Sequence, residues 1–264
     1  MASKKSGLSI EVSFPALKDK FNFCEGLCVE KSQYNLCLSI LRRFQRVGVL
    51  ENLLLIGSWC VVFYEQYFKP GGFDSTTLRT RDIDFLVPRP SQLMTAVDVP
   101  SLLEDLGFVM ARNSSGLIQL VHPDLLLEFL VPELGAGQDG LVPLPKLGMN
   151  AVALRFLNFL TDEVIRVETE DIVVQVPHPA SFALHKLIIA QRRKNKAKAE
   201  KDHNMAIDLL RALIKKGDSL KIKKTYDRVP HPWRMKILKG LNSTTEQDIW
   251  SVLTSLYPTP RGPK

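Results

Sequence analysis

The sequence predicts an α+β protein in which a small mixed β-sheet with flanking helices is followed by an all-helical C-terminal domain. Short apolar runs of strand length alternate with segments of helical periodicity as far as residue 176, and only helical periodicity follows. The 264 residues are 45% hydrophobic and 24% charged, which excludes collagen-like, disordered and disulfide-dense proteins. We therefore expect an N-terminal helical segment over 1–50, a sheet-containing core over 51–176 and the helical domain over 177–264.

The elements of the first half follow from apolar spacing and from the turn residues that bound each run. Apolar residues at helical spacing predict a first helix over 32–49, and Gly57 closes the next apolar run as it would close a strand. Residues 132–148 are rich in Gly and Pro and are expected to form a loop. The other expected elements are strand 53–56, helix 59–68, strand 83–87, helix 101–106 and strands 116–121 and 125–131.

The second half contains one hairpin and then helices. Two apolar runs, 164–167 and 172–176, are predicted to pair with each other. Thr244 and Gln247 stand at capping-box spacing and should open the last helix. The preceding expected helices are 180–193, 202–216 and 233–239.

The net charge of +7 is concentrated in one segment. Residues 192–228 contain 13 lysines and arginines against five aspartates and glutamates. This bias predicts a surface for phosphates or for RNA, such as a tRNA end. A solvated helix face is the alternative, and the charge count alone does not choose between them.

Targeting and redox signals point to the cytoplasm. No apolar run approaches the roughly 20 residues of a membrane span, and no apolar signal region follows Met1 to Leu8. The chain has only four cysteines, which fits a reducing compartment. Cys24 and Cys28 are separated by three residues without a second pair, so no zinc site is expected. We therefore expect a cytoplasmic protein without a membrane contact.

The segment 79–87 carries the strongest chemical signal. Side chains alternate across a strand, so Asp82 and Asp84 share one face while Ile83 and Phe85 share the other. Neighbouring carboxylates repel each other, and a divalent cation such as Mg²⁺ or Mn²⁺ relieves that repulsion. The pair therefore predicts a metal site, with two solvated aspartates at a strand end as the alternative.

Two further features strengthen this prediction. Gly57 and Ser58 lie between an apolar strand and a helix, where backbone amides and a hydroxyl can approach phosphate oxygens. Glu128 lies within an otherwise apolar strand and would need a partner or a cation. It is predicted to be the third carboxylate of a phosphoryl-transfer site, unless it lies on the solvated face of an edge strand.

Gly57-Ser58, a helix and then Thr80-Arg81-Asp82-Ile83-Asp84 together resemble the signature of the nucleotidyltransferase superfamily with the DNA-polymerase-β-type fold. The chain is more similar to a bacterial nucleotidyltransferase-fold group, through Tyr64-Glu65 and the stretch 179–187. It is also similar to the toxin-type nucleotidyltransferases of abortive-infection systems, which carry a lysine on one helix and a basic residue with an aspartate on the next. Those residues would be Lys186 and Lys201-Asp202.

The resemblance implies transfer of a nucleoside monophosphate from an NTP to an acceptor hydroxyl on RNA, on a protein or on a small molecule. Asp82, Asp84 and Glu128 would hold the metals, and Gly57 and Ser58 would hold the β- and γ-phosphates.

Nucleotide contacts from the helical domain are expected from Lys186, Arg192, Lys201 and Asp202. Asp202 would act by orienting Lys186 or an arginine, or would simply stand at a helix N-terminus. Two alternatives stay open. The protein could be a catalytically silent nucleotide- or nucleic-acid-binding protein with the same fold, or it could belong to a bacterial toxin–antitoxin or phage-defence pair and bind a partner protein.

Overall fold

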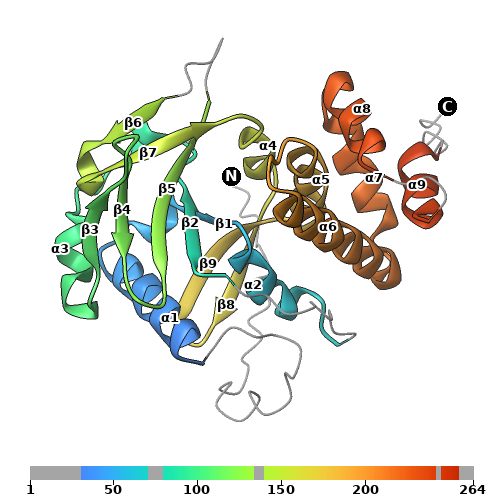
Figure 1. Cartoon of the computed structure of the whole chain (residues 1–264). Helices are drawn as coiled ribbons and strands as arrows, with labels where there is room; N and C mark the ends of the chain where they lie inside the picture. The colour runs from blue at the N-terminus through green and yellow to red at the C-terminus, as the bar shows by residue number, and fades with distance from the viewer. Residues whose placement is uncertain (1–30, 71–79, 134–139, 242–244, 256–264) are drawn as a thin grey trace, which may run out of the picture.

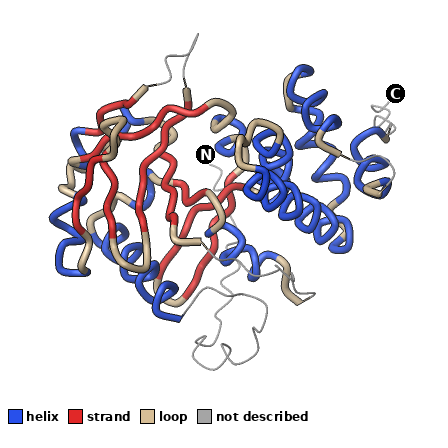
Figure 2. The backbone as a smooth tube through the Cα atoms, viewed as in Figure 1, coloured by secondary structure: helices blue, strands red, loops and turns tan. Residues whose placement is uncertain are grey.

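The computed structural model of the chain describes residues 31–70, 80–133, 140–241 and 245–255, as Figure 1 shows. Figure 2 shows the strands on one side of the molecule together with some of the helices, while the other side is helical only. The N-terminal pair Cys24 and Cys28 and the expected cap at Thr244 lie outside the described residues. Within the described residues, no helix is both long enough and apolar enough to cross a membrane.

The main sheet is mixed, as predicted. Its hydrogen-bonded path runs in the order β1 (Leu54–Ile56), β2 (Asp82–Leu86), β5 (Leu126–Pro132), β4 (Ile118–Val121) and β3 (Val109–Arg112). Off this path, β7 (Met149–Leu154) pairs with the second half of β5 and carries β6 (Leu141–Leu144) on its other side. The β2–β5 and β5–β7 pairs are parallel, and the other pairs are antiparallel.

One face of this sheet is the core side. Ile83 and Phe85 on β2 are fully buried, because strand alternation turns them away from the face that carries Asp82 and Asp84. Helix α1 (Lys31–Arg46) packs against this side, and the ring centroid of Phe44 lies 5.3 Å from that of Phe85. Helix α2 (Trp59–Tyr67) follows β1, and its residues Trp59 and Tyr64 are fully buried.

The predicted hairpin is present as a separate two-stranded sheet. Strands β8 (Val164–Thr169) and β9 (Ile172–Pro177) pair antiparallel, and β9 packs beside β1 and α1. The C-terminal region is helical, as predicted. Its helices are α5 (Pro179–Ala190), α6 (Lys196–Lys216), α7 (Ser219–Arg228), α8 (His231–Lys239) and α9 (Gln247–Thr254).

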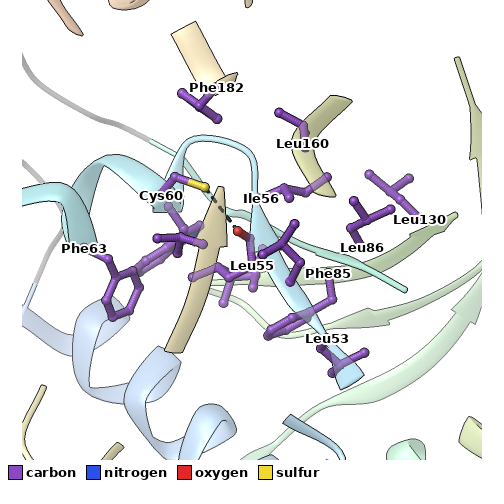
Figure 3. Close-up of a cluster of buried hydrophobic side chains, with 14 of the residues drawn as sticks. Leu53, Leu55, Ile56, Cys60, Phe63, Phe85, Leu86, Leu130, Leu160 and Phe182 are labelled. Atoms are coloured by element: carbon purple, nitrogen blue, oxygen red, sulfur yellow. Dashed lines mark hydrogen bonds between the residues drawn. The ribbon is translucent and has the colours of Figure 1, made fainter. Parts of the chain in front are cut away.

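A single buried cluster joins these parts. It includes residues from Tyr34 in α1 to Leu253 in α9. Figure 3 shows its centre, where Leu86, Leu130, Leu160 and Phe182 come from β2, β5, α4 (Asn158–Thr161) and α5. This apolar core extends across residues 50 and 176. The domain boundaries expected at these residues stay predictions.

Several elements differ from the sequence-based expectation. The loop expected over 132–148 contains β6 and the 3₁₀ turn Pro145–Leu147, while β3, β7 and α7 were not predicted at all. The helix expected from residue 202 begins at Lys196, because the Asn195 side chain accepts a hydrogen bond from the Lys198 amide at 3.0 Å and caps the helix. The expected helix over 101–106 is instead α3 (Val99–Leu103) followed by a 3₁₀ turn.

Candidate active site

Two parallel strands bring the predicted carboxylates together. Asp84 on β2 is in register with Ile56 on β1 and with Glu128 on β5, so its side chain shares a sheet face with Glu128. Asp82 is two residues earlier on the same face and is exposed, whereas Asp84 and Glu128 are partly buried. The sheet therefore gathers three carboxylates that are far apart in the sequence.

Crowding changes the proton affinity of Asp84. Burial raises the pKa of its carboxyl from the usual 3.8 to about 7, and the negative charges of Glu128 and Asp82 add to the shift. Lys186 and Arg193 oppose it, so both cations lie within electrostatic reach of Asp84. A carboxylate in such surroundings gains stability from an added positive charge.

Gly57 lies against Asp84 and has no room for a side chain. Its φ of +75° is in the left-handed region, and a Cβ added there would overlap Asp84 Oδ2. Ser58 follows as the residue before α2 and makes no side-chain capping bond to that helix. The turn expected to hold phosphates thus directly adjoins the central carboxylate.

Glu128 is held by a residue that the sequence-based prediction missed. Gln119 on β4 donates a hydrogen bond from Nε2 to Glu128 Oε1. Among the described residues, no three His, Cys, Asp or Glu side chains are grouped so that they could hold a metal ion. Gln119 could have been inferred from its place in the alternating strand beside Glu128, had the pairing of the two strands been known.

A buried ion cluster faces the carboxylates from the helical side. Lys186 on α5 and Asp202 on α6 are 7% and 5% exposed, and their Nζ and Oδ1 atoms are 2.6 Å apart. Arg193 Nε binds the other carboxylate oxygen of Asp202 at 2.9 Å. Burial alone would raise the pKa of Asp202, but Lys186 and Arg193 hold it below its ordinary value. Asp202 therefore forms ion pairs with both cations, and it lies within α6 rather than at its start.

The remaining predicted contacts divide between two locations. Burial and the charge of Lys186 lower the pKa of Lys201, while Asp82 opposes the shift, so Lys201 lies near the cluster. Arg192 instead places its guanidinium carbon 5.4 Å from the Phe156 ring centroid. Arg193, which lies in the turn between α5 and α6, binds Asp202. The pair of adjacent arginines at the end of the expected helix was the available signal.

His185 adjoins the same cluster. Its Nε2 atom is buried and has no hydrogen-bond partner among the described residues. Burial and the neighbouring Lys186 lower the pKa of His185 to about 3, so the imidazole is neutral at physiological pH. The neutral ring adds no further positive charge beside Lys186.

Comparisons with solved structures give distant similarities. An antigenic nucleotidyltransferase-like protein from Paracoccidioides brasiliensis is 13% identical, with a TM-score of 0.43 over 83% of this chain and 91% of that one. ANT(2″)-Ia in complex with adenylyl-2″-tobramycin is 14% identical, with a TM-score of 0.40 over 75% and 98% of the two chains. No curated protein matches the chain.

A family model described as nucleotidyltransferase matches residues 35–230. This range includes the carboxylates on β2 and β5, the Gly57 turn and the ion cluster between α5 and α6. It covers well over half of the sequence, and the chain therefore belongs to the nucleotidyltransferase family.

Proposed function

We propose that this protein is a metal-dependent enzyme of the cytoplasm that transfers a nucleoside monophosphate from an NTP to an acceptor hydroxyl. The observation that carries the proposal is the surroundings of Asp84. This carboxylate adjoins the Gly57 turn, shares a sheet face with Asp82 and Glu128, and lies within reach of Lys186 and Arg193.

The described residues hold no ready-made group of three ligands, but Asp82, Asp84 and Glu128 share one sheet face and offer the oxygen donors that Mg²⁺ or Mn²⁺ prefers. Carboxylate oxygens are the ligands that such ions prefer, and the negative charges of Glu128 and Asp82 add to the effect of burial in raising the pKa of Asp84. Asp82 and Asp84 would hold the ion, and Glu128 would join them by giving up its bond to Gln119. When bound, the ion neutralises charge on the triphosphate.

The side chains support in-line transfer. The acceptor oxygen forms a bond to the α-phosphorus while the bond from that phosphorus to the α,β-bridging oxygen breaks, and pyrophosphate leaves with the bonding electrons. Glu128 accepts the proton of the acceptor hydroxyl. The amides at Gly57 and Ser58 donate to the β- and γ-phosphates. Lys186, Arg193 and Lys201 balance the remaining negative charge, and positioning supplies most of the rate.

Label transfer tests this function. The protein is incubated with each α-³²P-NTP and Mg²⁺ or Mn²⁺, in the presence of total RNA and a small-molecule extract. We expect label on one of these acceptors or on the protein itself, and its loss in Asp84→Asn and Glu128→Gln. Glu168→Gln is the matched control, because Glu168 is an exposed strand glutamate on β8.

The opposite result would identify a silent binding protein. If no NTP gives label in any fraction while Mg²⁺-dependent binding of ATP persists, the transferase proposal fails and the binding protein with the same fold replaces it. Loss of label in Glu168→Gln as well would show that the effect of Glu128→Gln is not specific.

A further inference from the structure

The sheet face that carries the three carboxylates is covered over only part of its area. Leu86 and Leu130 lie on this face and are 0% and 8% exposed, and Figure 3 shows them within the buried cluster beside Leu160. One row further along the strands, Asp84 and Glu128 are partly exposed. In the next row Asp82 is exposed and Leu126 is partly exposed.

The uncovered area extends from the carboxylates to the edge of the sheet. Asp82 is in register with Leu126, Leu126 with Val121 and Val121 with Val109, so these side chains form one row on one face. Val109 at the edge is 63% exposed. The neighbouring row carries Glu128, Gln119 and Ala111, since Gln119 is bonded to Glu128 and is in register with Ala111. We name the five residues beyond the carboxylates the open sheet face: Val109, Ala111, Gln119, Val121 and Leu126.

The cations lie on the other side of the carboxylates. Lys186 and Arg193, in the helical region, oppose the rise of the Asp84 pKa, and Asp82 opposes the lowering of the pKa of Lys201 on α6. Figure 1 shows α5 and α6 beyond β1 and β2, at the opposite end of the sheet from β3. The open sheet face itself contains no lysine, arginine or histidine. A triphosphate is therefore attracted to the helical side, which leaves the open sheet face for the second substrate.

The size and chemistry of this surface restrict what it can bind. From β2 to β3 it spans three strand spacings, about 14 Å, and two rows along the strands span about 7 Å. This is the area of a molecule of two or three rings rather than of a folded RNA. One row is apolar, and the other offers the amide of Gln119 beside Glu128. Phosphate groups would meet carboxylates there, and none of the five residues of the open sheet face supplies a compensating cation.

We propose that the open sheet face binds the acceptor and that the acceptor is a small, phosphate-free alcohol with an apolar face. This inference rests on the transfer reaction proposed above. The acceptor hydroxyl would face Asp84 and Glu128, lose its proton to Glu128 and form the new bond to the α-phosphorus as pyrophosphate leaves. The apolar side of the acceptor would lie on Val121 and Leu126, and Gln119 would hydrogen-bond its polar edge.

The test combines a defined acceptor panel with two surface variants. The probes are phosphate-free sugars, nucleosides and aromatic alcohols, with total tRNA and the protein itself as competing acceptors. Val121→Lys introduces a long charged side chain on the open sheet face. Val173→Lys is the matched control, because Val173 is a 40% exposed strand valine on β9, in the other sheet. Val109→Lys repeats the test at a 63% exposed position, where lysine is tolerated by the fold.

We expect label on a phosphate-free probe. Val121→Lys should raise the KM for that probe about tenfold while the KM for the NTP stays unchanged, and Val173→Lys should change neither. If tRNA or the protein itself is labelled, and Val121→Lys and Val109→Lys do not reduce that labelling, the proposal is wrong. If a phosphate-free probe is labelled but neither variant changes its KM, the acceptor does not bind on the open sheet face. Absence of label with every acceptor would instead refute the transferase function itself.

Discussion

Asp84 binds its proton more tightly in the folded chain than in the unfolded chain. Its pKa rises from 3.8 to about 7 on folding, because of burial and then of Glu128 and Asp82. Between these values the folded state keeps a proton that the unfolded state has lost, so the free energy of unfolding falls as the pH rises. The difference between 3.8 and about 7 corresponds to at most about 4 kcal/mol.

The variant Asp84→Asn tests this directly, because the amide cannot ionise. In EDTA we expect its Tm to exceed that of the wild type at pH 8, with a difference that shrinks steadily toward pH 4.5. Scanning calorimetry of both proteins at several pH values measures this. A Tm difference that does not change with pH would show that Asp84 has an ordinary pKa.

The contact of Gly57 with Asp84 can be distinguished from ordinary backbone strain by comparing Gly57 with Gly217. Both have φ in the left-handed region, +75° and +91°, so alanine should cost each about 1 kcal/mol of backbone strain. Only at Gly57 would the new Cβ displace Asp84, since nothing lies within 4 Å at Gly217. We expect Gly57→Ala to lower transfer on the order of 100-fold.

Gly217→Ala should keep its activity and lose only stability, which urea unfolding measures. Equal activity losses in the two variants would mean that the contact between Gly57 and Asp84 does not matter for the reaction.

The sequence indicated the central residues of the candidate site because their chemistry conflicts with their surroundings. Asp84 and Glu128 stand in apolar strands and Lys186 stands in an apolar helix, where a charge needs a partner. Gln119 and Arg193 carry no such conflict. The place of Gln119 becomes visible only when the pairing of β4 with β5 is known. The sequence marks Arg193 as one of two adjacent arginines but does not show that it binds Asp202.

At the level of elements, the contact between α5 and α6 depends on the buried ion pair of Lys186 and Asp202. Lys186→Met removes one of the two cations that bind Asp202, and Asp202→Leu leaves the buried ammonium group of Lys186 without its ion-pair partner. We expect each single variant to lose about 3 to 5 kcal/mol. The double variant should lose clearly less than the sum of both.

Urea unfolding of the four proteins closes this double-mutant cycle. Additive losses would mean that the two groups do not interact in solution. The cycle also separates stability from function, because the double variant should regain folding without regaining the binding of NTP.

The elements that the sequence revealed are those with strong local patterns. Strand β2 alternates charged and apolar residues, and α6 carries an apolar stripe, so both were recognised. Strand β3 is short and exposed, and β6 contains a proline, so neither has a strand-like pattern. Strand β7 depends on distant contacts instead, since Asn150 accepts a hydrogen bond from the Ile118 amide at 2.7 Å.

Across the whole molecule, much of the positive charge in residues 192–228 is paired with carboxylates of the same chain. Arg211, Lys221 and Lys223 bind Asp248, Glu163 and Asp227. Lys198 lies near the site instead, because its charge contributes to the lowered pKa of Lys201.

Lys198 and Lys215 on α6 therefore form a matched pair, both exposed and about 26 Å apart along the helix. We expect Lys198→Glu to raise the KM for NTP several-fold at low salt and less at high salt. Lys215→Glu should leave the KM unchanged. Equal effects of both variants would mean that only the net charge matters, and the comparison is made by steady-state kinetics at two salt concentrations.

Helix α1 sets a lower limit on how far the protein can be shortened. Phe44 packs against Phe85, the neighbour of Asp84, and Arg43 donates a hydrogen bond to the Leu102 carbonyl oxygen at 2.7 Å. A fragment that begins at residue 51 would keep all three carboxylates and yet expose the apolar side of the strand that carries two of them. The smallest autonomous fragment with an intact site therefore begins no later than Lys31, the first residue of α1.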